Sequence, residues 1–336
     1  MLPEPVQSSN VVNTIRNWRS AMNVEEQSVV NVLGTRWLRV EGALDANIAA
    51  VANEMVRREQ AGEVITEALI ARSGRYKILK AQTAVEVSKY NKDADVIISN
   101  GQESAARMGI NTAQDAITVS LPPTAGAPSF NRINVKAVES MIGYAGDGSP
   151  LSDLLKNSYP DAVQGQLDAL INGVASGQSA DTVARAMRDG TAMGLDRSLV
   201  IARTEMNRSY RSGSTEQYRA SGVVEGFMRL VARDEACIAC LALDGERFDS
   251  ADEMDDHPNG RCTCVPVLNG EPPPEWEKAQ DWFASQDESK QLQILGPQRL
   301  ELYKNGTPLE AFATKNHSSV WGDSPAIVNL KDIKIS

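Results

Sequence analysis

The chain contains, at residues 234–267, the stretch DEACIACLALDGERFDSADEMDDHPNGRCTCVPV, in which all four of its cysteines lie. The stretch offers five candidate metal ligands, which are Cys237, Cys240, His257, Cys262 and Cys264. The first two form a C-x-x-C pair, the last two form a C-x-C pair further along, and the histidine lies shortly before the second pair. Two thiol pairs at this separation, with a nearby histidine, have the spacing of a structural zinc site. We therefore predict a small zinc-stabilised lobe over 234–267.

Five candidate ligands compete for the four places of a tetrahedral zinc ion. We favour the set Cys237, Cys240, His257 and Cys262, with Cys264 as the substitute for His257. Residues 262–267 are typical of a strand, in which alternate side chains face the same way, so both cysteines of the second pair could point at the metal. A closed site of this kind leaves no position open for water, so we expect a structural role. The alternatives are buried thiol pairs or a labile disulfide.

The residues between the two cysteine pairs are strongly acidic. We interpret them as a solvated loop, with divalent-cation binding as the alternative. The acidic residues of this loop are Glu246, Asp249, Asp252, Glu253, Asp255 and Asp256.

Composition limits the possible functions. The 336 residues include 34 Lys and Arg against 44 Asp and Glu, and this acidic balance argues against a protein that coats DNA without sequence preference. The first residues carry neither a basic segment nor an apolar run, so we expect no signal peptide. No stretch approaches the length of a membrane span. We expect a soluble, intracellular protein with reduced cysteines and no membrane association.

The N-terminal part has the periodicity of long helices. Apolar residues recur three or four positions apart at Leu33, Trp37, Val40, Leu44, Ile48, Val51 and Met55. This stripe predicts a helix over 24–60 packed in an antiparallel bundle, with an intermolecular coiled coil as the alternative. Further helices are predicted over 67–91 and 94–108.

The remaining periodicity predicts a mainly α protein with a small α+β zinc-stabilised lobe, long N-terminal helices, a helical middle domain and an extended C-terminal tail. Ser179 is the predicted N-cap of one middle helix. The predicted boundaries are 1–120 for the helical arm, 121–150 for a linker with a short helix, 151–270 for the middle domain with its lobe, 271–306 for two short helices, and 307–336 for the tail.

An arginine-rich helix precedes the lobe. Four of its arginines are candidate contacts to DNA or an acidic partner, namely Arg203, Arg208, Arg211 and Arg219. The alternative is that Arg203 and Glu205 form local hydrogen bonds as a structural motif, while the other arginines are solvated. With only two histidines in the chain, no nucleophile and base can be paired, so we predict no catalytic residues and no enzymatic activity.

The motifs over 161–266 resemble a known family. In chain order they are Gly177-Gln178-Ser179, Ile201-Ala202-Arg203-Thr204-Glu205, Asp234-x-x-Cys237-x-x-Cys240-x-x-x-Asp244-Gly245, and His257-Pro258-Asn259-x-Arg261-Cys262. Together they resemble the Mu F-like minor head, or head-morphogenesis, proteins of tailed phages. Members of that family often carry H-P-x-C-R-C, whereas this chain has Gly260 at the first of those cysteines and an additional Cys264.

The resemblance implies a structural minor capsid protein that is assembled in the host cytoplasm and located in the virion, inside the capsid near the portal vertex. It implies the portal protein and the major capsid or scaffold proteins as partners, and a role in DNA packaging or ejection with weak contact to DNA. We expect the N-terminal helices to dock on other head components or to form a homo-oligomer. One alternative is a nucleic-acid-binding zinc module. The other is an ADP-ribosylating enzyme, because Ser214-Thr215-Glu216 weakly resembles the active site of such enzymes.

Overall fold

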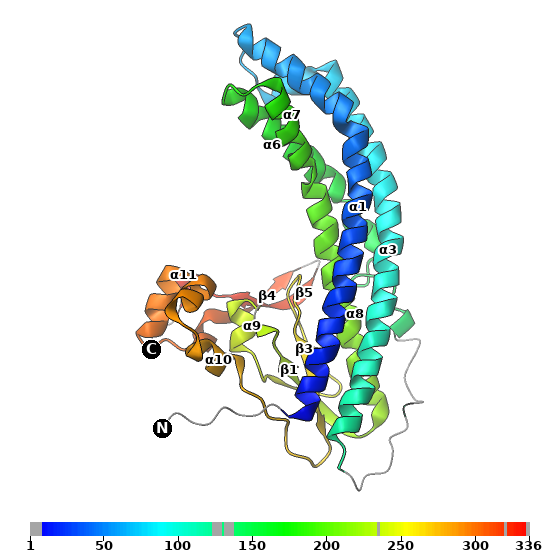
Figure 1. Ribbon diagram of the computed structural model, residues 1–336, viewed down its shortest axis with the longest axis vertical. Coiled ribbons are helices and arrows are strands. Elements are labelled where there is room, and N and C mark those ends of the chain that lie inside the picture. The colour runs from blue at the N-terminus through cyan, green and yellow to red at the C-terminus, as the bar shows by residue number, and fades with distance from the viewer. Residues whose placement is uncertain (1–8, 123–129, 131–137, 234–235, 319–320, 334–336) are drawn as a thin grey trace. The chain divides into compact units, whose positions relative to one another are not determined.

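The computed structural model describes residues 9–122, 130, 138–233, 236–318 and 321–333 and confirms a mainly α fold with small sheets. The long helices are α1 (Asn10–Gln60), α3 (Gly74–Ser120) and α8 (Met193–Ser221), shown in Figure 1. The shorter helices are α2 (Glu67–Arg72), α5 (Leu151–Leu155), α6 (Ser158–Ala175), α7 (Ala180–Thr191), α9 (Ile238–Ala242), α10 (Ala279–Ser285) and α11 (Glu288–Lys304). The described part of the chain contains no helix long and apolar enough to cross a membrane.

The chain divides into two compact units that differ from the predicted boundaries. The helical unit comprises residues 26–100 and 149–202, and the mixed unit comprises residues 1–25, 101–148 and 203–336. The predicted boundaries were placed at expected loops. In the structure α1, α3 and α8 each contribute residues to both units, so the division falls within helices. Residues 123–129 and 131–137, which include part of the predicted linker and of its short helix, lie outside the described residues.

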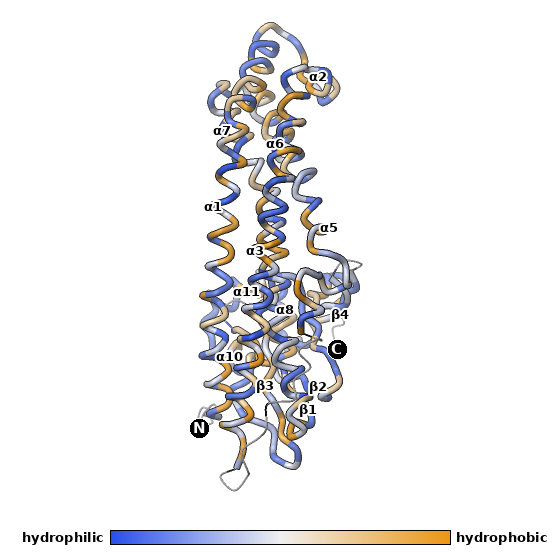
Figure 2. The backbone as a smooth tube through the Cα atoms, turned by 90° about the vertical axis from the view of Figure 1, so that its right-hand side faces the viewer, coloured by the Kyte–Doolittle hydropathy of each residue, from blue (hydrophilic) through white to orange (hydrophobic). Residues whose placement is uncertain are grey.

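The predicted apolar stripe forms the core of the helical unit. Its seven side chains, from Leu33 to Met55, are all 3% exposed or less. Trp37 meets Tyr90 of α3 edge-on, with ring centroids 4.7 Å apart. Figure 2 shows apolar and polar segments alternating along α1 and α3, as expected for helices with one buried face. The interpretation of the stripe as a helix face packed within a bundle is therefore confirmed.

The second predicted helical region has different boundaries in the structure. The predicted helices 67–91 and 94–108 are replaced by the short α2 and the continuous α3. Ser73 separates them, because its extended backbone ends α2 while its hydroxyl accepts a 3.3 Å hydrogen bond from the Tyr76 amide in the first turn of α3. The predicted N-cap of α7 is confirmed, since the Ser179 hydroxyl accepts a 3.3 Å hydrogen bond from the Thr182 amide.

The mixed unit is built around a three-stranded antiparallel sheet in the order β2-β1-β3. The strands are β1 (Val224–Leu230), β2 (Arg247–Asp249) and β3 (Thr263–Leu268), and the last of these confirms the strand predicted over 262–267. Phe227 of β1 faces Phe248 of β2, and their rings stack with centroids 5.2 Å apart. Tyr218 of α8 and Ile117 of α3 complete this core, which includes three of the four cysteines.

Helices α3 and α8 approach each other closely inside the mixed unit. A Cβ at Gly109 would overlap the carbonyl oxygen of Tyr210, and a Cβ at Gly213 would overlap the carbonyl oxygen of Ala106. Only glycine allows backbones to come this near. The close approach brings the Tyr210 hydroxyl within 3.0 Å of the Thr112 hydroxyl and buries both groups.

The C-terminal segment forms paired structure where an extended tail was predicted. Within 307–336 the chain forms the 3-10 turn η2 (Leu309–Phe312), a hairpin of β4 (Ala313–Ser318) and β5 (Gly322–Ile327), and the 3-10 turn η3 (Leu330–Asp332). The two strands carry few apolar residues, which is why their periodicity was weak. The segment is nevertheless anchored, because Leu309 and Phe312 are buried in the core of the mixed unit.

Candidate metal centre

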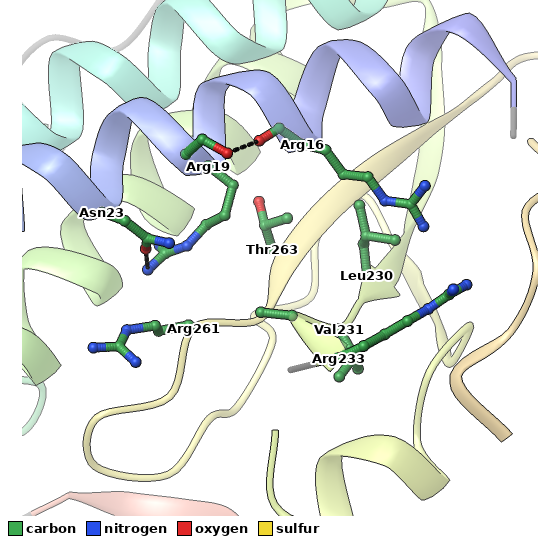
Figure 3. Close-up of a pocket in the computed structure, with 10 residues that line it drawn as sticks. Arg16, Arg19, Asn23, Leu230, Val231, Arg233, Arg261 and Thr263 are labelled. Carbon is green, nitrogen blue, oxygen red and sulfur yellow. Dashed lines mark hydrogen bonds between the residues drawn. The ribbon is translucent and has the colours of Figure 1, made fainter. Parts of the chain in front are cut away.

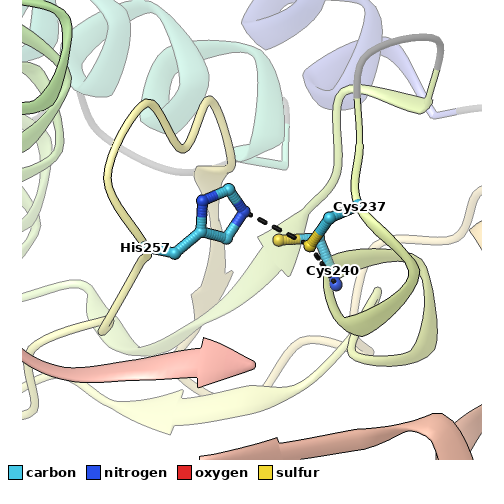
Figure 4. Close-up of side chains that lie close together, drawn as sticks. All are labelled: Cys237, Cys240 and His257. Carbon is cyan, nitrogen blue, oxygen red and sulfur yellow. Dashed lines mark hydrogen bonds between the residues drawn. The ribbon is translucent and has the colours of Figure 1, made fainter. Parts of the chain in front are cut away.

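The first cysteine pair lies at the start of α9. Cys237 is the N-cap residue, and its sulfur accepts a 3.4 Å hydrogen bond from the amide of Cys240. Cys240 is 1% exposed, while Cys237 is only half-buried. A C-x-x-C pair on one short turn therefore directs two sulfurs toward the same point, as Figure 4 shows. All four cysteines are free thiols, so the disulfide alternative is not formed.

His257 comes to this pair from a tight turn. The turn closes with a 2.8 Å hydrogen bond from the Gly260 amide to the His257 carbonyl, and Asn259 adopts a left-handed φ of 63°. The Nε2 atom of His257 lies 3.3 Å from the sulfur of Cys237 (Figure 4). Nδ1 lies 2.8 Å from the carbonyl oxygen of Pro258. If Nδ1 donates to that oxygen, Nε2 is left to face the sulfurs, which is the arrangement of a metal-ligating histidine.

Cys262 reaches the same region from the start of β3. The possible ligand atoms form two groups of three, and within each group all atoms lie within 4.8 Å of one another. One group is Cys237, Cys240 and His257, and the other is Cys240, Asp256 and Cys262. Three of the four favoured ligands therefore form one group, and Cys262 is connected to it through Cys240, which belongs to both groups. Cys264 belongs to neither group of described residues. It is buried further along β3, and the Tyr218 hydroxyl donates a 3.0 Å hydrogen bond to its carbonyl oxygen.

Asp256 is a possible ligand that was not predicted from the sequence, because the whole acidic loop was expected to be solvated. Its side chain is fully buried, and one carboxylate oxygen lies 3.9 Å from the Cys240 sulfur. The same oxygen accepts a 3.0 Å hydrogen bond from the His257 amide, while the other accepts one of 3.1 Å from the guanidinium of Arg211. A Cβ at Gly260 would overlap this carboxylate, so the aspartate occupies space that a side chain at position 260 would need. The glycine at position 260 was the one feature of the sequence that could have indicated a buried neighbouring side chain.

The pKa values of the cysteines and of His257 are shifted by contacts within the cluster and by burial. A hydrogen bond from the Cys240 thiol, followed by one from His257, lowers the pKa of Cys237 to about 4. The bond to Cys237 raises the pKa of His257 to about 9. Hydrogen bonding to Cys237 and Cys262 raises the pKa of Cys240, so this thiol keeps its proton. Burial raises the pKa of Cys264 to about 12, which makes it a poor source of thiolate. One thiolate is thus already formed, as metal binding requires.

Three of the four arginines predicted to meet DNA or a partner make contacts within the mixed unit. Arg208 donates a 2.6 Å hydrogen bond to the buried carboxylate of Glu205, and Arg219 pairs with Glu216 and donates to backbone carbonyls of the acidic loop. Arg211 pairs with Asp256. The structure places these side chains against internal acceptors, and their contact with DNA stays a prediction.

Glu205 and the predicted serine-threonine-glutamate stretch also have internal roles. The carboxylate of Glu205 accepts a 3.3 Å hydrogen bond from the Gly146 amide, and burial raises its pKa although Arg208 opposes the shift. Ser214 is 1% exposed in the middle of α8, and its hydroxyl lies 3.0 Å from the Gly109 carbonyl oxygen. The serine is therefore part of the packing between α3 and α8, which gives the ADP-ribosylating alternative no open site at this residue.

The comparison with protein families agrees with the motifs and the cluster. The family described as Phage Mu protein F like protein matches residues 164–268, which include Ile201–Glu205 and the whole Cys/His cluster. This match to a family of phage head proteins confirms the resemblance drawn from the motifs. No curated protein and no solved structure matches the chain.

Proposed function

We propose that this protein is a structural, non-enzymatic component of a tailed-phage head, present in the virion near the portal vertex and needed for head assembly and for DNA packaging or ejection. The observation that carries the proposal is the family match over 164–268, which includes every candidate metal ligand. The portal protein and the major capsid or scaffold proteins are the proposed partners. The helical unit is the proposed docking element for them.

We further propose that the cluster holds a structural zinc ion. Three sulfurs, one imidazole nitrogen and one carboxylate supply the donor types that zinc prefers, and the hydrogen bonds to Pro258 and Arg211 supply the outer contacts that orient such ligands. The proposed set is Cys237, Cys240, His257 and Cys262. Asp256 replaces Cys264 as the alternative fourth ligand, because it lies among the ligand atoms and Cys264 does not. Zinc bound there would join α9 to the start of β3 and so stabilise the lobe.

Metal content of the purified protein tests the zinc proposal. We expect one zinc per chain, measured by mass spectrometry, and its loss in Cys237→Ser and Cys262→Ser. Cys264→Ser is the matched control, since it removes a buried thiol outside the cluster, and it should retain the metal. Comparison of His257→Ala with Asp256→Asn identifies the fourth ligand, because only the true ligand should lower zinc affinity substantially. Wild-type protein without metal after purification under reducing conditions would contradict the proposal.

Complementation of a phage that lacks this gene tests the head function. Removing residues 1–120 would delete α1 and α3 and thereby the cores of both units, so point variants are the better probe. Leu38 is 65% exposed and Val96 is 59% exposed on the helical unit. Replacing both with Glu should reduce incorporation into proheads if this unit docks on a partner, whereas Asn31→Glu, a change at an exposed polar position of α1, should not.

Immunoblots of purified proheads give the first readout, and packaged DNA gives the second. Heads that assemble and package normally without the protein would contradict the proposed function. Light scattering of the purified protein separates docking on a partner from self-association. If the Leu38 and Val96 substitutions change the oligomeric state of the free protein, the proposed homo-oligomer accounts for the effect.

A further inference from the structure

A pocket of about 380 Å³ in the mixed unit has a strongly cationic lining. Four arginines border it, two from the first turns of α1 and two from the segments at the ends of β1 and β3: Arg16, Arg19, Arg233 and Arg261. None of the described residues that line it is acidic. In a chain whose formal net charge is −10, such a concentration of one sign is unusual. The volume is within the range of ligand sites, which are about 300–1,000 Å³.

Two acidic groups act on the arginines at one end of the pocket. Glu277 pairs with Arg233. Asp244 accepts hydrogen bonds of 2.9 Å from the Val231 amide, 2.9 Å from the Trp276 indole and 2.8 Å from the Ala279 amide. Burial, followed by the positive charge of Arg233, lowers the pKa of Arg16, although Asp244 and Glu277 oppose the shift, so Arg16 and Arg233 repel each other. An anion entering the pocket would relieve this repulsion.

The arginines lie at two ends of the pocket. Figure 3 shows the guanidinium groups of Arg16 and Arg233 at one end and those of Arg19 and Arg261 at the other, with Leu230, Val231 and Thr263 between them. Arg19 is held in place by hydrogen bonds to Asn207 and, at 2.7 Å, to Asn23. Two cationic ends separated by a less polar floor match a ligand with two anionic groups. Arginine forks, hydroxyls and amides are the groups that bind phosphate oxygens in proteins.

We propose that this pocket binds phosphate groups, two in each ligand, supplied either by a nucleic-acid backbone or by a free diphosphate. The proposal names a site that the family match and the metal cluster do not assign. It stands independently of the proposed head function. The arginines involved are distinct from those predicted to contact DNA, of which Arg208, Arg211 and Arg219 pair with internal carboxylates.

Binding assays on the full-length purified protein test the proposal. Inorganic pyrophosphate is titrated by calorimetry, and a short labelled DNA single strand and its duplex are followed by fluorescence anisotropy at low and physiological salt. Charge-assisted hydrogen bonds are strong enough that Arg16→Gln with Arg261→Gln should weaken binding about tenfold or more. Arg107→Gln is the matched control, because it removes an exposed arginine of the same unit, and it should change binding less than about twofold.

The pattern of losses identifies the source of the phosphate. If the double variant weakens both pyrophosphate and DNA, the pocket takes backbone phosphates; if it weakens pyrophosphate alone, the ligand is a free diphosphate. Arg16→Gln alone guards against an indirect effect of position 261 on Cys262, and zinc content and thermal melting are measured for each variant. The proposal is wrong if wild type binds neither probe, if the variants bind as wild type does, or if polyglutamate competes as well as pyrophosphate.

An effect on phosphate binding can be separated from an effect on head assembly. Arg16→Gln should still enter proheads if the pocket acts only on phosphate. Loss of incorporation with retained phosphate binding would instead assign Arg16 to docking and count against the phosphate site. Absence of the wild-type protein from proheads would count against the proposed function and leave the pocket unaffected.

Discussion

The guanidinium of Arg211 on α8 donates a 3.1 Å hydrogen bond to the fully buried carboxylate of Asp256 beside the cysteines. Only 10% of the Arg211 side chain is exposed. Removing one member of such a pair leaves the other charge buried, which costs about 3–5 kcal/mol. We expect Arg211→Met to lower the free energy of unfolding by this order, measured by urea denaturation. Arg211→Met combined with Asp256→Leu should be less destabilised than Arg211→Met alone, and an equal or greater loss would contradict this account.

Gly260 and Asp256 should behave as a coupled pair. A Cβ at position 260 would overlap the Asp256 carboxylate, so Gly260→Ala should displace it and lower stability by about 1–3 kcal/mol, as overpacking does elsewhere. The exchange Asp256→Gly with Gly260→Cys places a thiol in the vacated space and should bind zinc more tightly than Asp256→Gly alone. Zinc content and melting temperature measure both effects. Additive effects of the two substitutions would show that the positions are independent.

The glycines where α3 meets α8 are expected to be intolerant of substitution. At Gly109 and Gly213 an added Cβ would overlap a backbone carbonyl of the facing helix, so alanine at either position should cost about 1–3 kcal/mol. Gly34→Ala and Gly42→Ala are matched controls within α1, since nothing lies within 4 Å of either Cβ position. The controls should stabilise by about 0.5–1 kcal/mol through helix propensity. Equal effects at all four glycines in urea denaturation would refute the close-packing explanation.

The buried carboxyl of Glu205 should make stability depend on pH. Burial raises its pKa, so the folded state holds the proton more tightly than the unfolded state does. Its ionisation therefore opposes folding as the pH rises from the unfolded value, about 4.3, through the folded-state pKa. The stability of Glu205→Gln relative to wild type should increase as the pH rises from about 4 through the folded-state pKa of Glu205. Arg208→Gln, which removes the opposing cation, should show a steeper dependence than wild type, and a constant difference across this range would contradict the prediction.

Much of the fold could be predicted from the sequence because its signals are local. The stripe from Leu33 to Met55, the Ser179 cap and the strand predicted over 262–267 depend on residues close together in the chain, and each was found. The C-terminal hairpin was missed, since its strands carry few apolar residues and are anchored by Leu309 and Phe312, outside the strands. The units were missed because their boundaries fall inside continuous helices.

The candidate site was predictable in its ligands but not in its surroundings. Cysteine spacing selected Cys237, Cys240 and Cys262, which the structure places in the candidate cluster, while their binding of a metal stays a prediction. Apart from Gly260, nothing in the local sequence distinguishes Asp256 from the other acids of its loop. Its burial depends on Arg211, 45 residues earlier, and on the missing side chain of Gly260. The arginine pocket has the same origin, since Arg16 and Arg261 are brought to one cavity only by tertiary structure.

The passage of α1, α3 and α8 through both units has a consequence for inheritance. The region that matches the Mu F-like family begins in the helical unit and ends in the mixed unit. The ends of the matched region therefore do not coincide with the ends of a compact unit. A gene fragment encoding only 164–268 would lack Gly109 and Ile117 of α3, against which α8 and the sheet pack. Such a fragment could not move between genomes as an autonomous cassette, and recombination would have to carry the N-terminal helices with it.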